Sequence, residues 1–336
     1  MKRLRIGVIG LGRMGQHHCR IYSNQREAKF VGVYDVNPQV AKEISDKYDV
    51  PHYKLLDDLL TQVDAVSIAT PTRTHFDIAM RCLDRKIHML IEKPVTEKVE
   101  DAEQLAQIIR DNDTIVQIGH IERFNPTYVE LKKVLEGLKV IAISFRRLSP
   151  YRVSNKDVDV VLDLMVHDLD LCNDLTGKEP ATVNAYGLMP FSNSLDHVVA
   201  QLFYSNGPLI TLTASRVTEQ KIRSVDVTSE DAFIEADFMN KSISIHRGST
   251  GEFSEKSRNG VSYRQESVIE RILVPNVEPL SMEINHFLEC ISQKCSPRVT
   301  IFDGLKALRL AHQICMLVIE QNINHSILPE YSVQNV

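Results

Sequence analysis

The sequence contains no tryptophan, and aromatic residues occupy only 6% of its 336 positions. No apolar run approaches the roughly twenty residues that a membrane-spanning helix needs, so neither a membrane helix nor a secretion signal is expected. Basic residues are not in excess, because 39 Lys and Arg stand against 44 Asp and Glu, a net charge of −5. Such a chain is not expected to bind nucleic acid or an anionic membrane. We expect a cytoplasmic protein.

Cysteines are few, and none of them form a C-x-x-C pair. The six are Cys19, Cys82, Cys172, Cys290, Cys295 and Cys315. Scattered cysteines suit reduced thiols better than disulfides or a zinc site, so no metal is expected. The remaining composition, 43% hydrophobic and 25% charged, is that of a globular protein. The length suits two domains.

The opening of the chain has the spacing of a dinucleotide-binding turn. A short apolar run over residues 6–9 is followed by Gly10, Gly12 and Gly15, in the pattern G-x-G-x-x-G, and then by a helical segment. The glycines allow a tight turn, close approach of a pyrophosphate to the backbone, and close packing of the helix on the strand. Arg13 and Met14 lie inside this turn. The alternative is an ordinary βαβ unit whose glycines only turn the chain.

A second apolar run, over residues 30–34, ends in Asp35, twenty residues after Gly15. A carboxylate at this place accepts hydrogen bonds from the adenosine ribose hydroxyls. It also repels a 2′-phosphate, and the following Val36 and Asn37 offer no arginine to hold one. We therefore expect NAD as the cofactor rather than NADP.

Apolar runs over 65–70, 87–91 and 115–119 alternate with helical segments over 38–48, 74–85 and 101–112. This alternation predicts a parallel sheet with helices on both faces, and ligands of such sheets bind at the carboxyl ends of the strands. Besides the glycine turn and Asp35, the cofactor-site candidates that follow these strands are Thr70, Pro71, His75, Glu92 and Lys93. His75 could instead simply begin a helix. His17 and His18 are expected on a helix surface.

From about residue 121 the pattern changes to short alternating runs separated by Gly, Asn, Ser and Pro. It predicts an antiparallel sheet with one solvated face, accompanied by helices over 125–137, 158–175, 282–294 and 303–322. Residues 251–265 are polar and are expected to form a hairpin tip or loop. The predicted fold is therefore α/β, with a doubly wound parallel Rossmann sheet in residues 1–122. Residues 123–336 form an α+β domain built on a mostly antiparallel open sheet.

Lys93 is the first candidate for proton chemistry. It leaves an apolar strand and precedes Pro94, which favours an extended backbone at the strand end. A lysine in a partly desolvated cleft has a lowered pKa and can relay a proton. A solvated surface lysine is the alternative.

Asp163 and His167 are the second candidate, because residues four apart share one face of a helix. A carboxylate there orients the imidazole and raises its basicity. The neighbouring residues are apolar, so both groups are expected to be buried, and buried polar groups need partners or a function. A purely structural pair is one alternative. A metal site that includes Asp170 is another, although no His or Cys cluster completes a ligand set.

Arg146 and Arg147, followed by Tyr151, could clamp a phosphate bidentately. A charged strand edge would have the same sequence. Which of the two interpretations holds depends on the face of the sheet to which each arginine side chain points.

Taken together, these motifs resemble the glucose-fructose oxidoreductase, inositol dehydrogenase and MocA family over essentially the whole chain. The resemblance rests on the glycine turn, Ala69-Thr70-Pro71 with His75, Glu92-Lys93-Pro94, and Asp163 four residues before His167. It implies NAD(P)-dependent oxidation of a sugar or cyclitol hydroxyl, and a second domain whose open sheet is often used for oligomerisation. By position, Lys93, Asp163 and His167 match the family's catalytic residues.

Within the family, residues 119–126 and 146–150 are similar to members that oxidise the 3-hydroxyl of UDP-N-acetylglucosamine. This similarity predicts a sugar or nucleotide-sugar substrate bound by Arg123, Asn125, Arg146, Arg147 and Tyr151. Other dehydrogenases or reductases of the family, and a non-catalytic nucleotide sensor, stay open. An exposed apolar sheet face would need a partner, so a homodimer or homotetramer is expected.

Overall fold

The computed structural model describes residues 3–151, 158–248, 253–257, 260–264 and 267–324. The chain divides into two compact units. Unit 1 comprises residues 1–125 and 277–309, and unit 2 comprises residues 126–276 and 310–336. Within the described ranges, none of the helices has the length and apolar character needed to cross a membrane.

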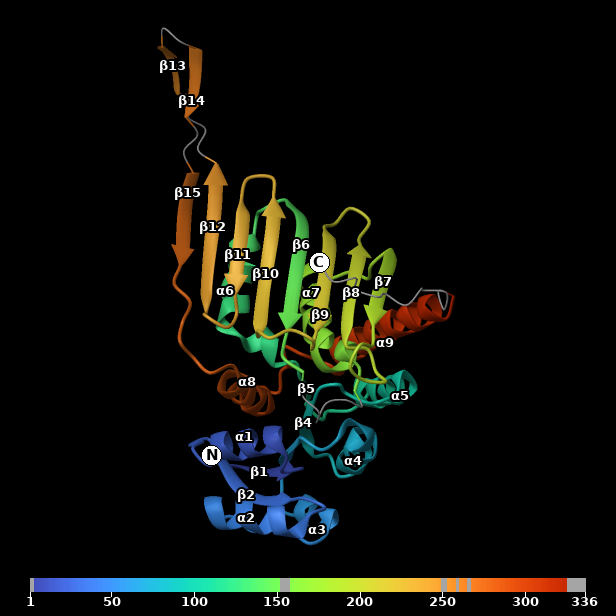
Figure 1. The fold of residues 1–336 in the computed structure, drawn as a ribbon. Coiled ribbons are helices and arrows are strands. Elements are labelled where there is room, and N and C mark those ends of the chain that lie inside the picture. The colour runs from blue at the N-terminus through green and yellow to red at the C-terminus, as the bar shows by residue number, and fades with distance from the viewer. Residues whose placement is uncertain (1–2, 152–157, 249–252, 258–259, 265–266, 325–336) are drawn as a thin grey trace. The chain divides into compact units, whose positions relative to one another are not determined.

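Unit 1 is built on a five-stranded, fully parallel sheet, which confirms the predicted Rossmann architecture (Figure 1). Its strands are β1 (Leu4–Ile9), β2 (Ala28–Tyr34), β3 (Ala65–Ile68), β4 (His88–Glu92) and β5 (Val116–Gly119), in the order β2-β1-β3-β4-β5. Its helices include α1 (Arg13–Tyr22), α2 (Pro38–Tyr48), α3 (Leu56–Leu60), α4 (His75–Leu83) and α5 (Val99–Arg110). The strand order reverses at β1 and β3, where sheets of this kind bind ligands.

Helix α8 (Pro279–Gln293) completes the core of unit 1, although it comes late in the chain. Its apolar face includes Leu280, Ile284 and Phe287, all buried in one cluster with Ile6 and Val8 of β1. The helix packs beside α1 (Figure 1). The parallel sheet therefore depends on a segment far from it in sequence.

Unit 2 contains an eight-stranded sheet in the order β15-β12-β11-β10-β6-β9-β8-β7. Only β6 and β9 run parallel, so the prediction of a mostly antiparallel sheet is confirmed. The strands are β6 (Val140–Leu148), β7 (Thr182–Leu188), β8 (His197–Phe203), β9 (Leu209–Ser215), β10 (Ile222–Ser229), β11 (Phe233–Asp237), β12 (Ser242–Gly248) and β15 (Ser267–Ile272). The described part of the polar segment 251–265 forms a separate hairpin of β13 (Phe253–Ser257) and β14 (Gly260–Arg264).

Helices cover one face of this sheet (Figure 1). They are α6 (Pro126–Leu135), α7 (Val166–Thr176) and the part of α9 (Ile301–Asn324) that belongs to unit 2. The strand alternation gives the other face large exposed side chains, among them Tyr186, Leu188 and Phe203. The predicted single solvated face is therefore present.

A buried ion pair lies in unit 2 where β8 begins and β9 ends. The Asp196 carboxylate is completely buried and accepts a hydrogen bond of 2.7 Å from Nε of Arg216. It also accepts the backbone N–H groups of Phe191 and Ser192. Burial opposes ionisation, but the Phe191 N–H and the Arg216 guanidinium hold the pKa of Asp196 below its ordinary value.

Replacing Asp196 with Ala should lower the free energy of unfolding by about 3–5 kcal/mol, because the buried Arg216 guanidinium would lose the carboxylate that accepts its Nε–H. Since the folded-state pKa of Asp196 is depressed, its contribution is present above the unfolded pKa and is lost as the pH falls below about 4. Urea unfolding at pH 7 and pH 3 measures both effects. Glu230→Ala, which breaks the exposed pair with Lys139, is the control and should change stability by at most about 0.5 kcal/mol.

Candidate functional site

A cavity of about 740 Å³ lies at the carboxyl edge of the parallel sheet in unit 1. The predicted cofactor residues that line it are Gly10, Gly12, Met14, Asp35, Thr70, Pro71, Glu92 and Lys93. They come from the ends of four strands, β1, β2, β3 and β4. The fold therefore brings together residues that are up to 83 positions apart in sequence.

The three glycines of the turn have different local reasons to be glycine. Gly10 has a positive φ of 85°, and a Cβ there would lie 2.7 Å from the backbone of Ala69 on the neighbouring strand end. A Cβ at Gly15 would lie 1.8 Å from the carbonyl oxygen of Gly10. A Cβ at Gly12 would meet no atom within 4 Å. Steric contact thus explains Gly10 and Gly15.

Open space beside Gly12 is what a bound pyrophosphate requires. Gly12 lines the cavity and precedes the first turn of α1, and no side chain caps that helix end. The N–H groups of such a turn bind phosphate oxygens. Arg13, which begins α1, is exposed, whereas Gly15 is buried beneath the turn. The residues present therefore fit a dinucleotide.

Asp35 is held in place by backbone groups on both sides. Its Oδ2 accepts the N–H of Leu11 at 2.7 Å, and its Oδ1 accepts the N–H of Asn37 at 2.8 Å. A carboxylate oxygen accepts more than one hydrogen bond, so these contacts leave capacity for ribose hydroxyls. The carboxylate consequently joins the glycine turn to the end of β2.

Glu92, at the end of β4, is bonded to a residue that we expected on the surface. His18 is completely buried, and its Nε2 lies 3.0 Å from Oε1 of Glu92. Burial favours the neutral acid, yet the hydrogen bond from His18 and the positive charge of Lys93 bring the pKa of Glu92 below its ordinary value. The prediction for His18 was wrong because its partners lie 49 and 74 residues away. His17 is exposed, as predicted.

His75 is buried and directs both ring nitrogens at backbone carbonyls. Nδ1 lies 3.0 Å from the oxygen of Pro94, and Nε2 lies 2.9 Å from the oxygen of Thr70. Burial lowers the pKa of His75, and the two carbonyls oppose that effect. The ring therefore joins the loop after β3 to the loop after β4, and shapes the cavity wall through Thr70.

In unit 2, Asp163 and His167 lie one turn apart in a helix that departs from the predicted form. A single helix over 158–175 was expected, but helical geometry begins at Val160, and residues Val161–Met165 form a π-turn before α7. Both side chains are half-buried. Single π-turns are frequent at functional sites. No group of three or more His, Cys, Asp or Glu in the described residues could hold a metal ion.

Arg146 and Arg147 do not form one phosphate clamp, because successive residues of a strand point to opposite faces. Arg147 is buried on the helix face, where Nε and Nη2 bind Asp168 of α7 at 2.9 and 2.6 Å. Arg146 is exposed on the opposite face. The alternation rule could have separated the two arginines from the sequence alone.

The other predicted substrate residues have partners within their own units. Arg123 is buried, with Nη2 3.6 Å from Oδ1 of Asp303. Asn125 donates to Oε2 of Glu122 at 2.8 Å. Tyr151 donates its hydroxyl to the Phe191 carbonyl at 3.4 Å. Their predicted contact with substrate stays a prediction.

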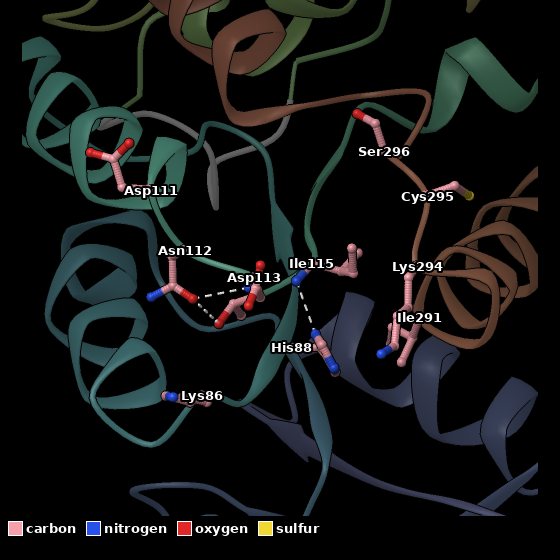
Figure 2. Close-up of a pocket in the computed structure, with 11 residues that line it drawn as sticks. Lys86, His88, Asp111, Asn112, Asp113, Ile115, Ile291, Lys294, Cys295 and Ser296 are labelled. Carbon is pink, nitrogen blue, oxygen red and sulfur yellow. Dashed lines mark hydrogen bonds between the residues drawn. The ribbon is translucent and has the colours of Figure 1, made fainter.

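A second cavity in unit 1, of about 710 Å³, lies at the amino ends of β4 and β5. Its charged lining residues are Lys86, Asp111, Asp113 and Lys294, which bring charges of both signs. Figure 2 shows these side chains spread around the opening, without converging on one point. Since ligands of such sheets bind at the carboxyl ends, this cavity is not the cofactor site.

Comparison with known proteins agrees with this geometry. A family model described as an oxidoreductase family with an NAD-binding Rossmann fold matches residues 4–120, and the model of its C-terminal alpha/beta domain matches residues 143–318. UDP-N-acetylglucosamine 3-dehydrogenase of Acidithiobacillus ferrooxidans is 32% identical, over 92% of this chain and 95% of that protein. Its solved structure matches ours with a TM-score of 0.84, and the match covers 95% of this chain and 98% of that chain. The scyllo-inositol 2-dehydrogenase (NAD(+)) of Bacillus subtilis is 26% identical, over 90% of each chain.

Replacing Gly12 with Val should leave the fold intact and weaken NAD binding by at least about tenfold, because the new side chain enters only the open space of the cavity. Calorimetric titration with NAD measures the loss, and thermal unfolding checks the fold. Gly15→Val is the contrasting variant, since its side chain would collide with the Gly10 carbonyl and should lower the melting temperature. Normal NAD binding by the Gly12 variant would show that the pyrophosphate lies elsewhere.

Proposed function

The chain belongs to the Gfo/Idh/MocA oxidoreductase family and is a dehydrogenase of CH–OH groups, and we propose that it oxidises the 3-hydroxyl of UDP-N-acetylglucosamine with NAD. The observation that carries the proposal is the unit 1 cavity, where a dinucleotide turn, Asp35 and Lys93 meet. The choice of sugar is supported by the similarity to the Acidithiobacillus enzyme over nearly the whole chain. Inositol or another sugar is the alternative, favoured by the inositol dehydrogenases among the relatives.

Several residues have proposed roles in this reaction. The first turn of α1, with Gly10, Gly12 and Met14, binds the pyrophosphate, and Asp35 binds the adenosine ribose. NAD, when bound, supplies the acceptor for a hydride. His167, assisted by Lys93, takes the one proton of the hydroxyl, and Asp163 orients His167. The position of Lys93 supports its role, because it is half-buried and lines the cavity at the end of β4.

We also propose that residues 1–122 bind the cofactor and that residues 123–336 bind the substrate and form a homodimer or homotetramer. The exposed face of the eight-stranded sheet supports the association. Tyr186, Phe203 and Leu209 on adjacent strands are each more than 40% exposed there. Apolar groups gathered in this way are stabilised by a partner surface.

Purified protein with NAD should form NADH with UDP-N-acetylglucosamine and not with N-acetylglucosamine, glucose or myo-inositol. A 3-oxo-sugar trap or an aminotransferase must be present, because oxidation of an alcohol by NAD is uphill. Lys93→Ala and His167→Ala should each lower kcat by about 100-fold to 10,000-fold while NAD binding stays near normal. Absorbance at 340 nm and calorimetric titration measure the two quantities.

Turnover with inositol or a free sugar alone would contradict the nucleotide-sugar assignment and keep the family activity. Wild-type turnover by the Lys93 or His167 variant would remove that residue from the mechanism. NAD binding without turnover on any compound of the panel would contradict the proposed substrate and favour a sensor.

Asp35→Asn should lower the preference for NAD over NADP by about tenfold, because it removes the charge that repels a 2′-phosphate and keeps an acceptor for the Asn37 N–H. Dissociation constants of both cofactors measure the change. Asp77→Asn is the matched control, since Asp77 lines the same cavity on α4 and should leave the ratio unchanged. Tighter binding of NADP by the wild-type protein would contradict the role of Asp35.

A further inference from the structure

We propose that His18 is a positioning residue, which fixes the Glu92 carboxylate beside Lys93 and joins the helix of the glycine turn to the end of β4. The inference rests on the proposed function for its kinetic consequence, because it assigns Lys93 a part in the reaction. Its geometric basis is a series of buried, hydrogen-bonded polar side chains that ends at Glu92, a residue of the cavity lining.

The series connects three elements of unit 1. Nε2 of His18 on α1 lies 3.0 Å from Oε1 of Glu92 on β4, and Nδ1 lies 2.9 Å from Oγ of Ser67 on β3. The same Oγ lies 2.8 Å from the hydroxyl of Tyr22, one turn further along α1. His18 and Ser67 are completely buried, Tyr22 is 1% exposed and Glu92 is 8% exposed. Buried groups of this kind fix one arrangement when every bond is made.

The donor and acceptor of each hydrogen bond in this series can be assigned. An ionised Glu92 can only accept, so Nε2 of His18 donates to it. In a neutral imidazole Nδ1 then accepts, and Ser67 must donate to it. The Ser67 oxygen in turn accepts from the Tyr22 hydroxyl. Each of the three bonds then has one donated proton, and in each bond the donor is the group farther from Glu92.

The other carboxylate oxygen of Glu92 is confined from the opposite side. A Cβ on Gly119 of β5 would lie 3.2 Å from Oε2 of Glu92, so this oxygen packs closely against the β5 backbone. The charged or titratable groups that act on Glu92 are His18 from α1, His75 from α4 and the adjacent Lys93. Tyr22, the residue of this hydrogen-bonded series farthest from Glu92, is buried, and after that burial the charge of Glu283 on α8 also raises its pKa.

Two consequences follow for Lys93. It is the next residue after Glu92, so an anchored Glu92 side chain limits how far the backbone of Lys93 can shift. The helix that carries His18 also begins at the turn that binds the pyrophosphate, so one rigid element sets both positions. Displacements of about 1 Å in a reacting group can cost about a hundredfold in rate.

The kinetic experiment compares three variants under the conditions of the substrate panel. His18→Leu removes donor and acceptor together, and should lower kcat by about 100-fold with the KM for the sugar and the Kd for NAD within about threefold of wild type. His18→Gln offers one amide donor and one carbonyl acceptor and cannot be protonated, so it should recover kcat to within about fivefold of wild type. His17→Leu, on the exposed side of the same helix, is the control.

A second experiment needs no substrate. In protein labelled with ¹³C at the glutamate carboxyl, the signal that disappears in Glu92→Gln identifies Glu92, and its pH titration can be followed by NMR. His18→Leu should raise the titration midpoint of Glu92 by at least about one pH unit, because burial then acts without the imidazole donor. His18→Gln should restore most of the difference.

An unchanged Glu92 midpoint in His18→Leu would overturn the proposal, as would an equal loss of kcat in the Leu and Gln variants. A rise of KM with unchanged kcat would also overturn it. If the midpoint moves as expected but the wild-type protein oxidises no sugar of the panel, the proposed function fails, and His18 remains the residue that fixes Glu92.

Discussion

Close approach of backbone to backbone at the carboxyl edge of the parallel sheet is the constraint on which unit 1 depends. The turn after β1 passes so near the end of β3 that Gly10 has no room for a side chain, and α1 approaches the same turn at Gly15. This proximity exposes the first turn of α1 to the cavity and puts Asp35 within reach of the Leu11 N–H. The cavity is thus mainly a consequence of backbone geometry, and the same backbone fixes the Asp35 carboxylate at its wall.

A second constraint, the cost of burying charge, organises the polar residues of both units. Glu92 is stabilised by His18, Arg147 by Asp168, and Asp196 by Arg216. In each case the partner comes from another element of the same unit, so the pair fixes how those elements pack. Removing one partner would therefore leave the other charge in the interior without this bond, which destabilises the fold.

The sequence was informative where local spacing determines geometry. Gly10, Gly12, Asp35 and Lys93, which we predicted for the cofactor site, line one cavity at the carboxyl edge of the parallel sheet. It was uninformative for His18, whose partners Ser67 and Glu92 lie on β3 and β4, far from it in sequence. The π-turn at Asp163 left no signal in the hydrophobic pattern. The paired arginines are a different case, since the alternation of β6 was predicted and already implied opposite faces.

The substrate half of the chain is harder to interpret because its polar residues already have structural partners. Arg147 binds Asp168 in the interior, so replacing Arg147 would remove a buried ion pair, and a loss of activity could follow from that structural change whatever the substrate. Arg123 and Asn125 are buried with protein partners in unit 1 and are subject to the same ambiguity. Arg146 is exposed, and the carboxylate on which its charge acts, Asp226, is only half-buried. Among the predicted arginines it is therefore the one whose substitution would report on ligand contact rather than on folding.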